Sequence, residues 1–222
     1  MTLDLYLLPE RDRLLLVGYL TAKEFVVRAG FASDIDWAEN LRFVQLTPGY
    51  VMRETAWVIV NSGFRFQVAR KLWPALEDAF NGFDPERIDE RCRPGALRVL
   101  NYPRKIDAII QMACLVRDCF DIIVEHRADV DYLRSLPFIG PVTCYHLAKL
   151  LGADVVKPDV HLVRASTAAE MEPQALCNLL GSLTGDRATT VDSVLWRWAE
   201  QKQAKLEDWM LLFSSATKQE LS

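Results

Sequence analysis

This 222-residue sequence lacks any cluster of cysteines and histidines that could hold a metal. The five cysteines include no pair with C-x-x-C spacing, and the three histidines, His126, His146 and His161, are scattered. Disulfide frameworks need paired cysteines, and zinc or iron–sulfur sites need clustered ligands. We therefore expect no disulfide framework, no bound metal and no cofactor.

Long uncharged hydrophobic runs are also missing. No stretch of about 18 apolar residues is free of charge, which argues against a membrane-spanning helix. The apolar stretch 14–20 follows four charged residues, 10–13, and no small-residue cleavage site comes after it, which is typical of a buried helix rather than a signal peptide. Half of the residues are hydrophobic and a quarter are charged, which is ordinary for a globular protein. Because no signal peptide is recognised, we expect a cytoplasmic location, and we also expect a monomer.

The sequence also has no overall excess of positive charge, because its net charge is −4. Binding to nucleic acid depends on local patches more than on global charge. Residues 87–105 contain six basic and two acidic side chains, and Arg65, Arg70 and Lys71 form a second small group. A solvated surface is the common explanation of such groups, so on their own they only permit a nucleic-acid partner.

Alternating strand patterns are few, and helical spacing dominates. Apolar residues between positions 106 and 123 recur at three- and four-residue intervals, the pattern of an amphipathic helix, and Pro103 is placed to begin that helix. The stripe comprises Ile106, Ile109, Ile110, Ala113, Val116, Phe120 and Ile123. We predict an all-α protein that forms one large domain or two lobes.

The segment 133–151 predicts a helix-hairpin-helix. A short helix closes before Leu136, a tight turn follows, and Pro141 opens a second helix that Gly152 ends. Backbone N–H groups at such a helix start can bind a phosphate oxygen without reading sequence. Because Pro141 has no donor, we expect the phosphate contacts at Gly140, Val142 and Thr143. An ordinary corner between two packed helices stays open as the alternative.

The next segment, Lys157 to Arg164, places an aspartate at a helix start. Lys157 precedes a proline and should be extended, so Asp159 falls in the first turn of the following helix, where amide donors favour its ionised form. Asp159 is either a helix cap or a catalytic carboxylate. Lys157 and Arg164 are candidates for phosphate binding, although Arg164 is equally compatible with a structural ion pair.

Together these two segments resemble the helix-hairpin-helix DNA glycosylase superfamily. The matching positions are Leu136, Pro137, Ile139 and Gly140 of the hairpin, followed by Asp159, His161, Leu162 and Arg164. The resemblance implies one glycosylase domain over residues 1–222 that binds double-stranded DNA in a cleft between two helical lobes. One lobe would be 68–165, with the hairpin at about 133–151, and the other 1–67 with 166–222. It also implies that Asp159 is catalytic.

Residues 50–165 are more closely similar to 3-methyladenine DNA glycosylase I, through Asn61–Phe66, Phe80–Pro85, Asn101 with Arg104–Ile106, and Phe138–Gly140 with Cys144 and Tyr145. Three departures matter. The terminal zinc ligands of that family are absent, its base-recognising glutamate falls at Val58, and Asp159 matches the aspartate of the wider superfamily, which that family lacks. Phe138 replaces the glycine that is more usual in the wider superfamily, and the 3-methyladenine family tolerates phenylalanine there. In addition, Val142 stands where bifunctional glycosylases carry a nucleophilic lysine, so strand cleavage through a Schiff base is not expected.

The expected reaction is hydrolysis of a base–deoxyribose bond after the base has been flipped out of the duplex, leaving an abasic site. Trp57, Phe64 and Phe66 could stack on that base or belong to the core, and the amide of Asn61 could read its edge. The neutral amide favours a hypermodified cytosine of phage DNA, such as a glucosylated hydroxymethylcytosine, removed in antiviral defence. The alternatives are an alkylated purine removed in DNA repair and a non-catalytic DNA-structure-binding protein.

Overall fold

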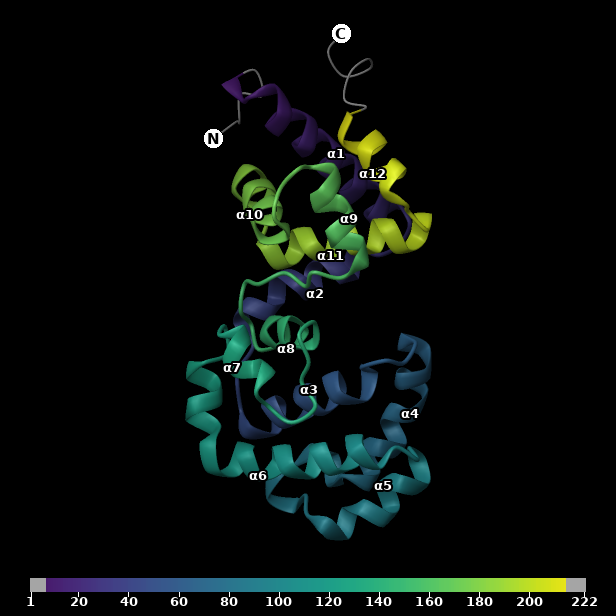
Figure 1. The fold of residues 1–222 in the computed structure, drawn as a ribbon, viewed down its shortest axis with the longest axis vertical. Helices are drawn as coiled ribbons and strands as arrows, with labels where there is room; N and C mark the ends of the chain where they lie inside the picture. Colours follow the sequence, from purple (N-terminus) through teal and green to yellow (C-terminus); the bar gives the residue numbers. More distant parts are fainter. Residues whose placement is uncertain (1–6, 215–222) are drawn as a thin grey trace. The chain divides into compact units, whose positions relative to one another are not determined.

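In the computed structural model, which describes residues 7–214, every regular element is a helix. Figure 1 shows this all-helical architecture, which confirms the predicted fold class at the level of secondary structure. Within the described residues no helix combines the length and the apolar character that crossing a bilayer requires.

The chain divides into two compact units. The hairpin unit runs from Phe43 to Ala153, and the aspartate unit combines the described residues up to Arg42 with those from Asp154 onward. The expected lobe boundaries at 67/68 and 165/166 are therefore corrected to 42/43 and 153/154. The reason is packing, because the helix before position 67 packs on the long central helix of the hairpin unit, whereas the helix after position 159 packs on the C-terminal helices.

The hairpin unit is built on a long helix, α6, against which α3 packs along its length; α3 also packs on α8 (Figure 1). The predicted apolar stripe of α6 is buried, except that Phe120 is only half-buried, and Pro103 begins the helix as expected. The elements are α3 (Pro48–Asn61), α4 (Phe66–Ala79), α5 (Arg93–Val99), α6 (Pro103–Glu125), α7 (Val130–Arg134) and α8 (Thr143–Leu150), with the 3-10 turns η3 (Asn81–Phe83), η4 (Pro85–Arg87) and η5 (Glu90–Cys92).

The aspartate unit is organised around α11, which packs against α1, α2, α9 and α10. A helix surrounded on most sides should be buried on most sides, and α11 is buried at nearly every position from Ala188 to Leu195. The elements are α1 (Glu10–Arg28), α2 (Ala32–Asn40), α9 (Val160–Ala168), α10 (Pro173–Thr184), α11 (Ala188–Lys202) and α12 (Leu206–Ser214), and the short turn η2 (Leu41–Phe43) crosses the first boundary between the units.

Candidate functional site

The predicted hairpin is present, with α7 and α8 joined by the turn 135–142. The N–H of Cys144 donates to the carbonyl of Gly140 at 3.0 Å, which starts the helical pattern of α8. The N–H of Gly140 donates to Oγ1 of Thr143 at 2.7 Å. One of the three donors expected for phosphate is thus used within the turn itself.

The other two expected donors, the N–H groups of Val142 and Thr143, have no hydrogen-bond acceptor among the described residues. Val142 is exposed at 39%, so this end of α8 is accessible to solvent. Unpaired N–H groups at an exposed helix start can accept an anion, since the helix dipole adds a positive field there. The turn therefore has two of the three donors that a phosphate contact was expected to use.

Gly140 is not required by the packing of the turn. A Cβ atom there would lie 3.6 Å from Oγ1 of Thr143, an ordinary van der Waals contact, and no other described atom beyond the adjoining residues would lie within 4 Å. Its φ is also outside the left-handed region that favours glycine. The fold leaves free space beside the Gly140 backbone, where a phosphate oxygen could approach.

Phe138 adopts a left-handed backbone conformation, with φ of 63°. For a residue with a bulky side chain this conformation costs roughly 1–2 kcal/mol, which explains why a glycine would suit this position better. The ring packs edge-on against Tyr102, with 6.1 Å between centroids. The strained turn thus places an aromatic ring of the hairpin against the residue that precedes α6.

Lys105 is a buried cation of the hairpin unit, with 2% of its surface exposed. Its Nζ donates to the carbonyl oxygens of Val60 at 2.7 Å and Ser62 at 2.5 Å, and so closes the C-terminal end of α3. Burial lowers its pKa to about 8. Lowered pKa values are typical of Schiff-base lysines, but this amine is enclosed and engaged by two carbonyls, which argues against a nucleophilic role.

Sequence reasoning missed the role of Lys105 and counted it in a basic surface segment. Its spacing contained the signal, because Lys105, Ile109, Met112 and Val116 lie on one helical face and are all buried. The segment 87–105 is moreover not one positive surface. Arg91 pairs with Asp89 at 2.5 Å, and Arg93 pairs with Asp107 at 2.7 Å.

Asn61 ends α3 between the two residues whose carbonyls bind Lys105. Its Oδ1 is buried and has no hydrogen-bond partner among the described residues. An unpaired buried amide oxygen is unusual, because it costs roughly 1–3 kcal/mol. Of the four residues predicted to bind a base, Asn61 is the one with a buried polar atom that no described residue pairs with.

A half-buried stripe of α3 continues from Asn61 through Trp57 and Glu54 to Tyr50, at four- and three-residue spacing. Tyr50 donates its hydroxyl to the carbonyl of Leu150 at 3.0 Å and joins the stripe to α8. Burial raises the pKa of Glu54. Sequence reasoning missed Glu54, whose signal is its helical spacing to Trp57 and Asn61.

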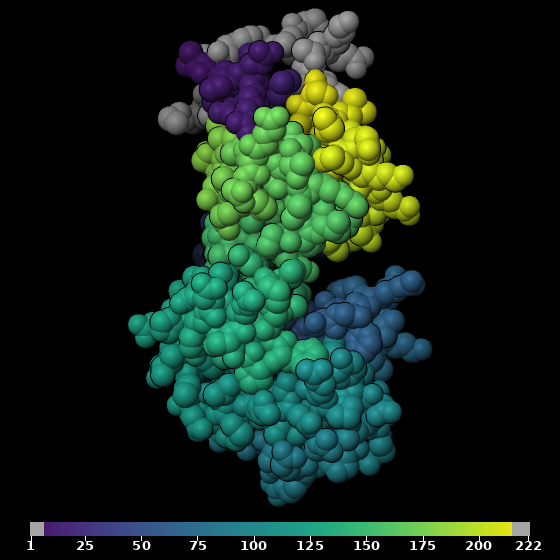
Figure 2. Space-filling view, viewed as in Figure 1, coloured from purple at the N-terminus to yellow at the C-terminus, as the bar shows by residue number. Residues whose placement is uncertain are grey.

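The three predicted aromatic residues separate into two groups. Trp57 packs edge-on against Phe66 and Trp73, with centroids 5.8 and 5.1 Å away, whereas the Phe64 ring lies 4.4 Å from Nζ of Lys105. Phe66 is 56% exposed. In Figure 2 the blue atoms at the start of α4 stand out from the unit, and the surface is hollowed between them and the teal atoms of the hairpin segment.

The exposed basic residues at this end of α4 are the second basic group, Arg65, Arg70 and Lys71. None of them forms an ion pair with a described residue. Residues 43–153 carry 14 basic and 13 acidic side chains, whereas the rest of the chain carries 12 and 17. The excess negative charge of the protein thus lies outside the hairpin unit.

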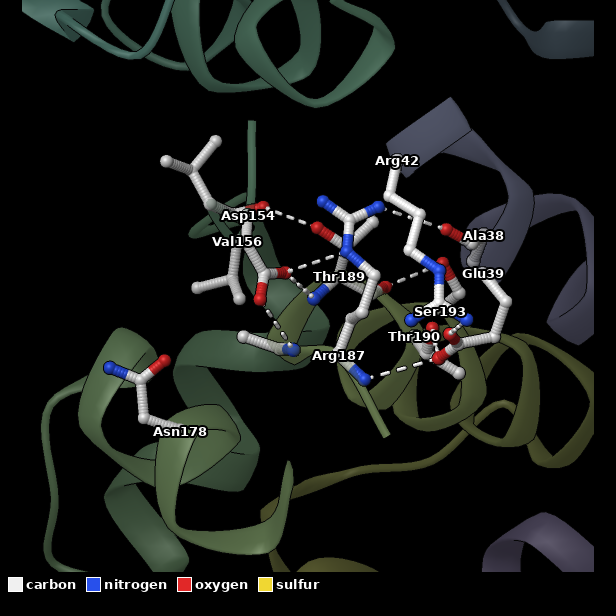
Figure 3. Close-up of polar contacts among 12 residues, drawn as sticks. Ala38, Glu39, Arg42, Asp154, Val156, Asn178, Arg187, Thr189, Thr190 and Ser193 are labelled. Atoms are coloured by element: carbon white, nitrogen blue, oxygen red, sulfur yellow. Dashed lines mark hydrogen bonds and ion pairs between the residues drawn. The ribbon is translucent and has the colours of Figure 1, made fainter. Parts of the chain in front are cut away.

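In the aspartate unit, the segment that leads to Asp159 is fixed by a series of hydrogen bonds. The carboxylate of Asp154 accepts from the N–H groups of Ala188 and Thr189 at 3.3 and 2.9 Å (Figure 3). Farther along, the N–H of Val156 donates to Oε1 of Gln174 at 3.1 Å, and that of Lys157 donates to Oδ2 of Asp192 at 3.3 Å. Helices α10 and α11 thereby set the position at which α9 begins.

Asp159 is the N-cap of α9, so the predicted helix start is confirmed. Its Oδ1 accepts from the N–H groups of His161 and Leu162 at 2.9 and 3.1 Å. Its Oδ2 has no hydrogen-bond partner among the described residues. The half-buried carboxylate is therefore oriented through one oxygen and available through the other.

The neighbours of Asp159 differ in their freedom to bind a ligand. The Arg164 guanidinium donates to the carbonyl of Ala204 at 3.2 Å, a structural contact that ties α9 to the segment before α12. The half-buried Lys157 has no ion-pair partner among the described residues. Nδ1 of His161 is buried without a hydrogen-bond partner in the described part of the chain.

Comparisons with known proteins add no relative to these observations. No family model, no curated protein and no solved structure matches the chain.

Proposed function

We propose that the protein is a monofunctional DNA glycosylase that flips a modified base out of double-stranded DNA and hydrolyses its N-glycosidic bond. The observation that carries the proposal is the hairpin turn. It leaves the N–H groups of Val142 and Thr143 without an intramolecular acceptor beside a glycine that the fold does not require. Backbone donors in this arrangement suit a DNA phosphate, which gives affinity without sequence readout.

Asp159 supports the catalytic part of the proposal. As the bond between C1′ and the base nitrogen breaks, the base leaves with the electron pair and positive charge develops on the sugar. A carboxylate held through Oδ1, with Oδ2 unoccupied, can stabilise that charge and accept a proton from the water whose oxygen forms the new bond to C1′. Val142 at the position of the bifunctional lysine supports hydrolysis without strand cleavage.

Asn61 supports base recognition within the hairpin unit. Its buried and unpaired Oδ1 would gain a donor from a bound base, which recovers the free energy lost by leaving it unpaired. The substrate is then either a hypermodified cytosine, in antiviral defence, or an alkylated purine, in repair. The cleft between the lobes that the resemblance implies stays a prediction.

A non-catalytic DNA-binding protein is the second candidate function. The observation that favours it is that Asp159 already has a structural task as the cap of α9. In that case the carboxylate would contribute to folding and not to chemistry.

The test is abasic-site formation on a panel of duplexes that contain alkylated purines or hypermodified cytosines. We expect aldehyde-reactive abasic sites in at least one class, with the strand intact until it is treated with alkali. Strand breaks that precede any treatment would contradict the monofunctional assignment. Salt-dependent binding to every duplex without abasic sites in any would favour the second candidate.

A further inference from the structure

The aromatic rings that surround Lys105 bear on which bases the proposed site accepts. We infer that the site accepts electrically neutral bases that present an N–H donor and discriminates against cationic alkylated bases, because the chain's own ammonium group already occupies the aromatic cage beside Asn61. This inference rests on the proposed function and names its substrate class.

The cage is built from three separate segments of the hairpin unit. Nζ of Lys105 lies 4.4 Å from the centroid of Phe64, which follows α3, and 5.5 Å from those of Tyr102, which precedes α6, and Phe138, in the hairpin turn. Aromatic faces at such distances attract cations, and open cages of this kind bind methylated ammonium groups. Here the cage is filled from within, so a cationic ligand cannot gain the same attraction.

The charge of Lys105 is not balanced by a carboxylate next to it. Its hydrogen bonds go to two neutral carbonyl groups, and among the described residues no acidic side chain forms an ion pair with it. The position where the resemblance would put a glutamate is Val58, which is buried and apolar. The nearest acid on α3 is Glu54, seven residues before Asn61, which is about 10 Å along the helix axis.

A buried ammonium acts at a distance because the surroundings screen it weakly. Its pKa of about 8 leaves it protonated at neutral pH. A second positive charge within about 10 Å in partly buried surroundings would be repelled enough to weaken binding by about tenfold or more. The environment of Asn61 is therefore unfavourable to N7- or N3-alkylated purines, which carry a positive charge in DNA.

Asn61 defines what the accepted base must offer. Its buried Oδ1 is an acceptor without a donor, and an amino group on a neutral base edge would complete it. Cytosine derivatives carry such an amino group without a net charge. Within the proposed function, the two observations together favour a modified cytosine over an alkylated purine.

The experiment compares two duplexes that differ in charge at one base. One contains N7-methylguanine, and the other contains 7-deaza-7-methylguanine, a neutral base of the same shape. Competition binding at mildly acidic pH gives the ratio of the two affinities for the wild type, Lys105→Met and Lys105→Arg. Because both ligands are measured on the same protein, the ratio is independent of the fraction of each variant that is folded. The matched control is Lys202→Met, which removes a lysine of α11 that lies over the ring of Phe25 in α1.

We expect the wild type, Lys105→Arg and Lys202→Met to favour the neutral base, and the ratio to shift by about tenfold towards the cationic base in Lys105→Met. An unchanged ratio in Lys105→Met, or a preference of the wild type for the cationic base, would overturn the inference. If Lys105→Met does not fold, the test is the wild-type preference: a preference for the neutral base supports the inference, and a preference for the cationic base overturns it.

Failure of the proposed function gives a different pattern. No salt-dependent binding to either duplex overturns both the proposed function and the inference. The expected shift in ratio, without abasic sites on any substrate, supports the inference about charge and overturns the proposed chemistry.

Discussion

At the N-terminus of α11, the N–H groups of Arg187, Ala188 and Thr189 donate to the carboxylates of Glu39 and Asp154 (Figure 3). At the N-terminus of α8, those of Val142 and Thr143 meet no acceptor within the described chain. Helix starts need partners for these donors. The first helix receives them from the protein itself, and the second is left available to a ligand.

Two glycines show the same difference between the two units. A Cβ on Gly181, in α10, would lie 2.6 Å from the carbonyl oxygen of Asp186, so the packing of the aspartate unit requires a glycine there. A Cβ on Gly140 would make only an ordinary contact at 3.6 Å. The difference separates a glycine that the packing requires from a glycine whose surroundings leave room for a ligand.

Gly181→Ala should have the largest effect on folding. The methyl group would overlap a backbone oxygen that cannot move independently, so we expect the free energy of unfolding to fall by about 2–3 kcal/mol. Urea denaturation measures the change. DNA affinity of the folded fraction should stay at the wild-type value, and a fully stable Gly181→Ala protein would show that the packing argument is wrong.

Asp154→Ala opens the closed helix start. Two N–H groups of α11 lose their acceptor, together with the ion pair to Arg187 at 3.7 Å. Loss of such a cap typically costs about 1–2 kcal/mol, and the midpoint of urea denaturation should move accordingly. Asp154→Asn, which retains an acceptor oxygen, should recover most of this loss; equal destabilisation by both variants would argue against the capping role.

Gly140→Ala tests the open helix start. The fold has room for the methyl group, so the free energy of unfolding should change by less than about 0.5 kcal/mol. A methyl group between the turn and a phosphate should weaken duplex binding by about tenfold, which corresponds to about 1.4 kcal/mol. Fluorescence anisotropy with labelled duplex measures the affinity. An unchanged affinity for duplex DNA would show that the hairpin turn does not contact the DNA backbone.

The ammonium group of Lys105, which closes the C-terminus of α3, should make the free energy of unfolding depend on pH, with a smaller effect. Burial lowers its pKa from 10.5 to about 8 in the folded protein. Between these values the unfolded chain holds a proton that the folded protein has lost, so stability rises with pH across this window. Relative to Lys105→Met, the wild type should gain about 1 kcal/mol between pH 8 and pH 9 in urea denaturation. A constant difference would show that the amine titrates as if it were exposed.

Local signals in the sequence were enough to predict several of the helices. Pro103 and the stripe 106–123 predicted α6, and the turn chemistry around Gly140 and Pro141 predicted α8 to within about two residues. Asp159 was predicted at a helix start because Pro158 excludes a continuing helix before it. These features depend on residues close to one another in the chain.

The environment of the site could not be predicted in the same way. The aromatic cage joins Phe64, Tyr102 and Phe138, which no local pattern relates. Burial of Lys105 contradicts the usual exposure of lysine and depends on the carbonyls at the end of α3. The unit boundaries depend equally on long-range packing, because α3 and α9 each join a different unit from the one expected.

The central claim is that Asp159 performs chemistry in addition to capping α9. The most direct measurement is abasic-site formation by Asp159→Asn under single-turnover conditions with saturating DNA, beside Asp154→Asn. Asparagine caps a helix as well as aspartate does, so both variants should fold and bind DNA. We expect Asp159→Asn to lose base release by about a hundredfold or more, and Asp154→Asn to keep it. Base release by Asp159→Asn at the wild-type rate would contradict the claim and leave Asp159 as a structural cap.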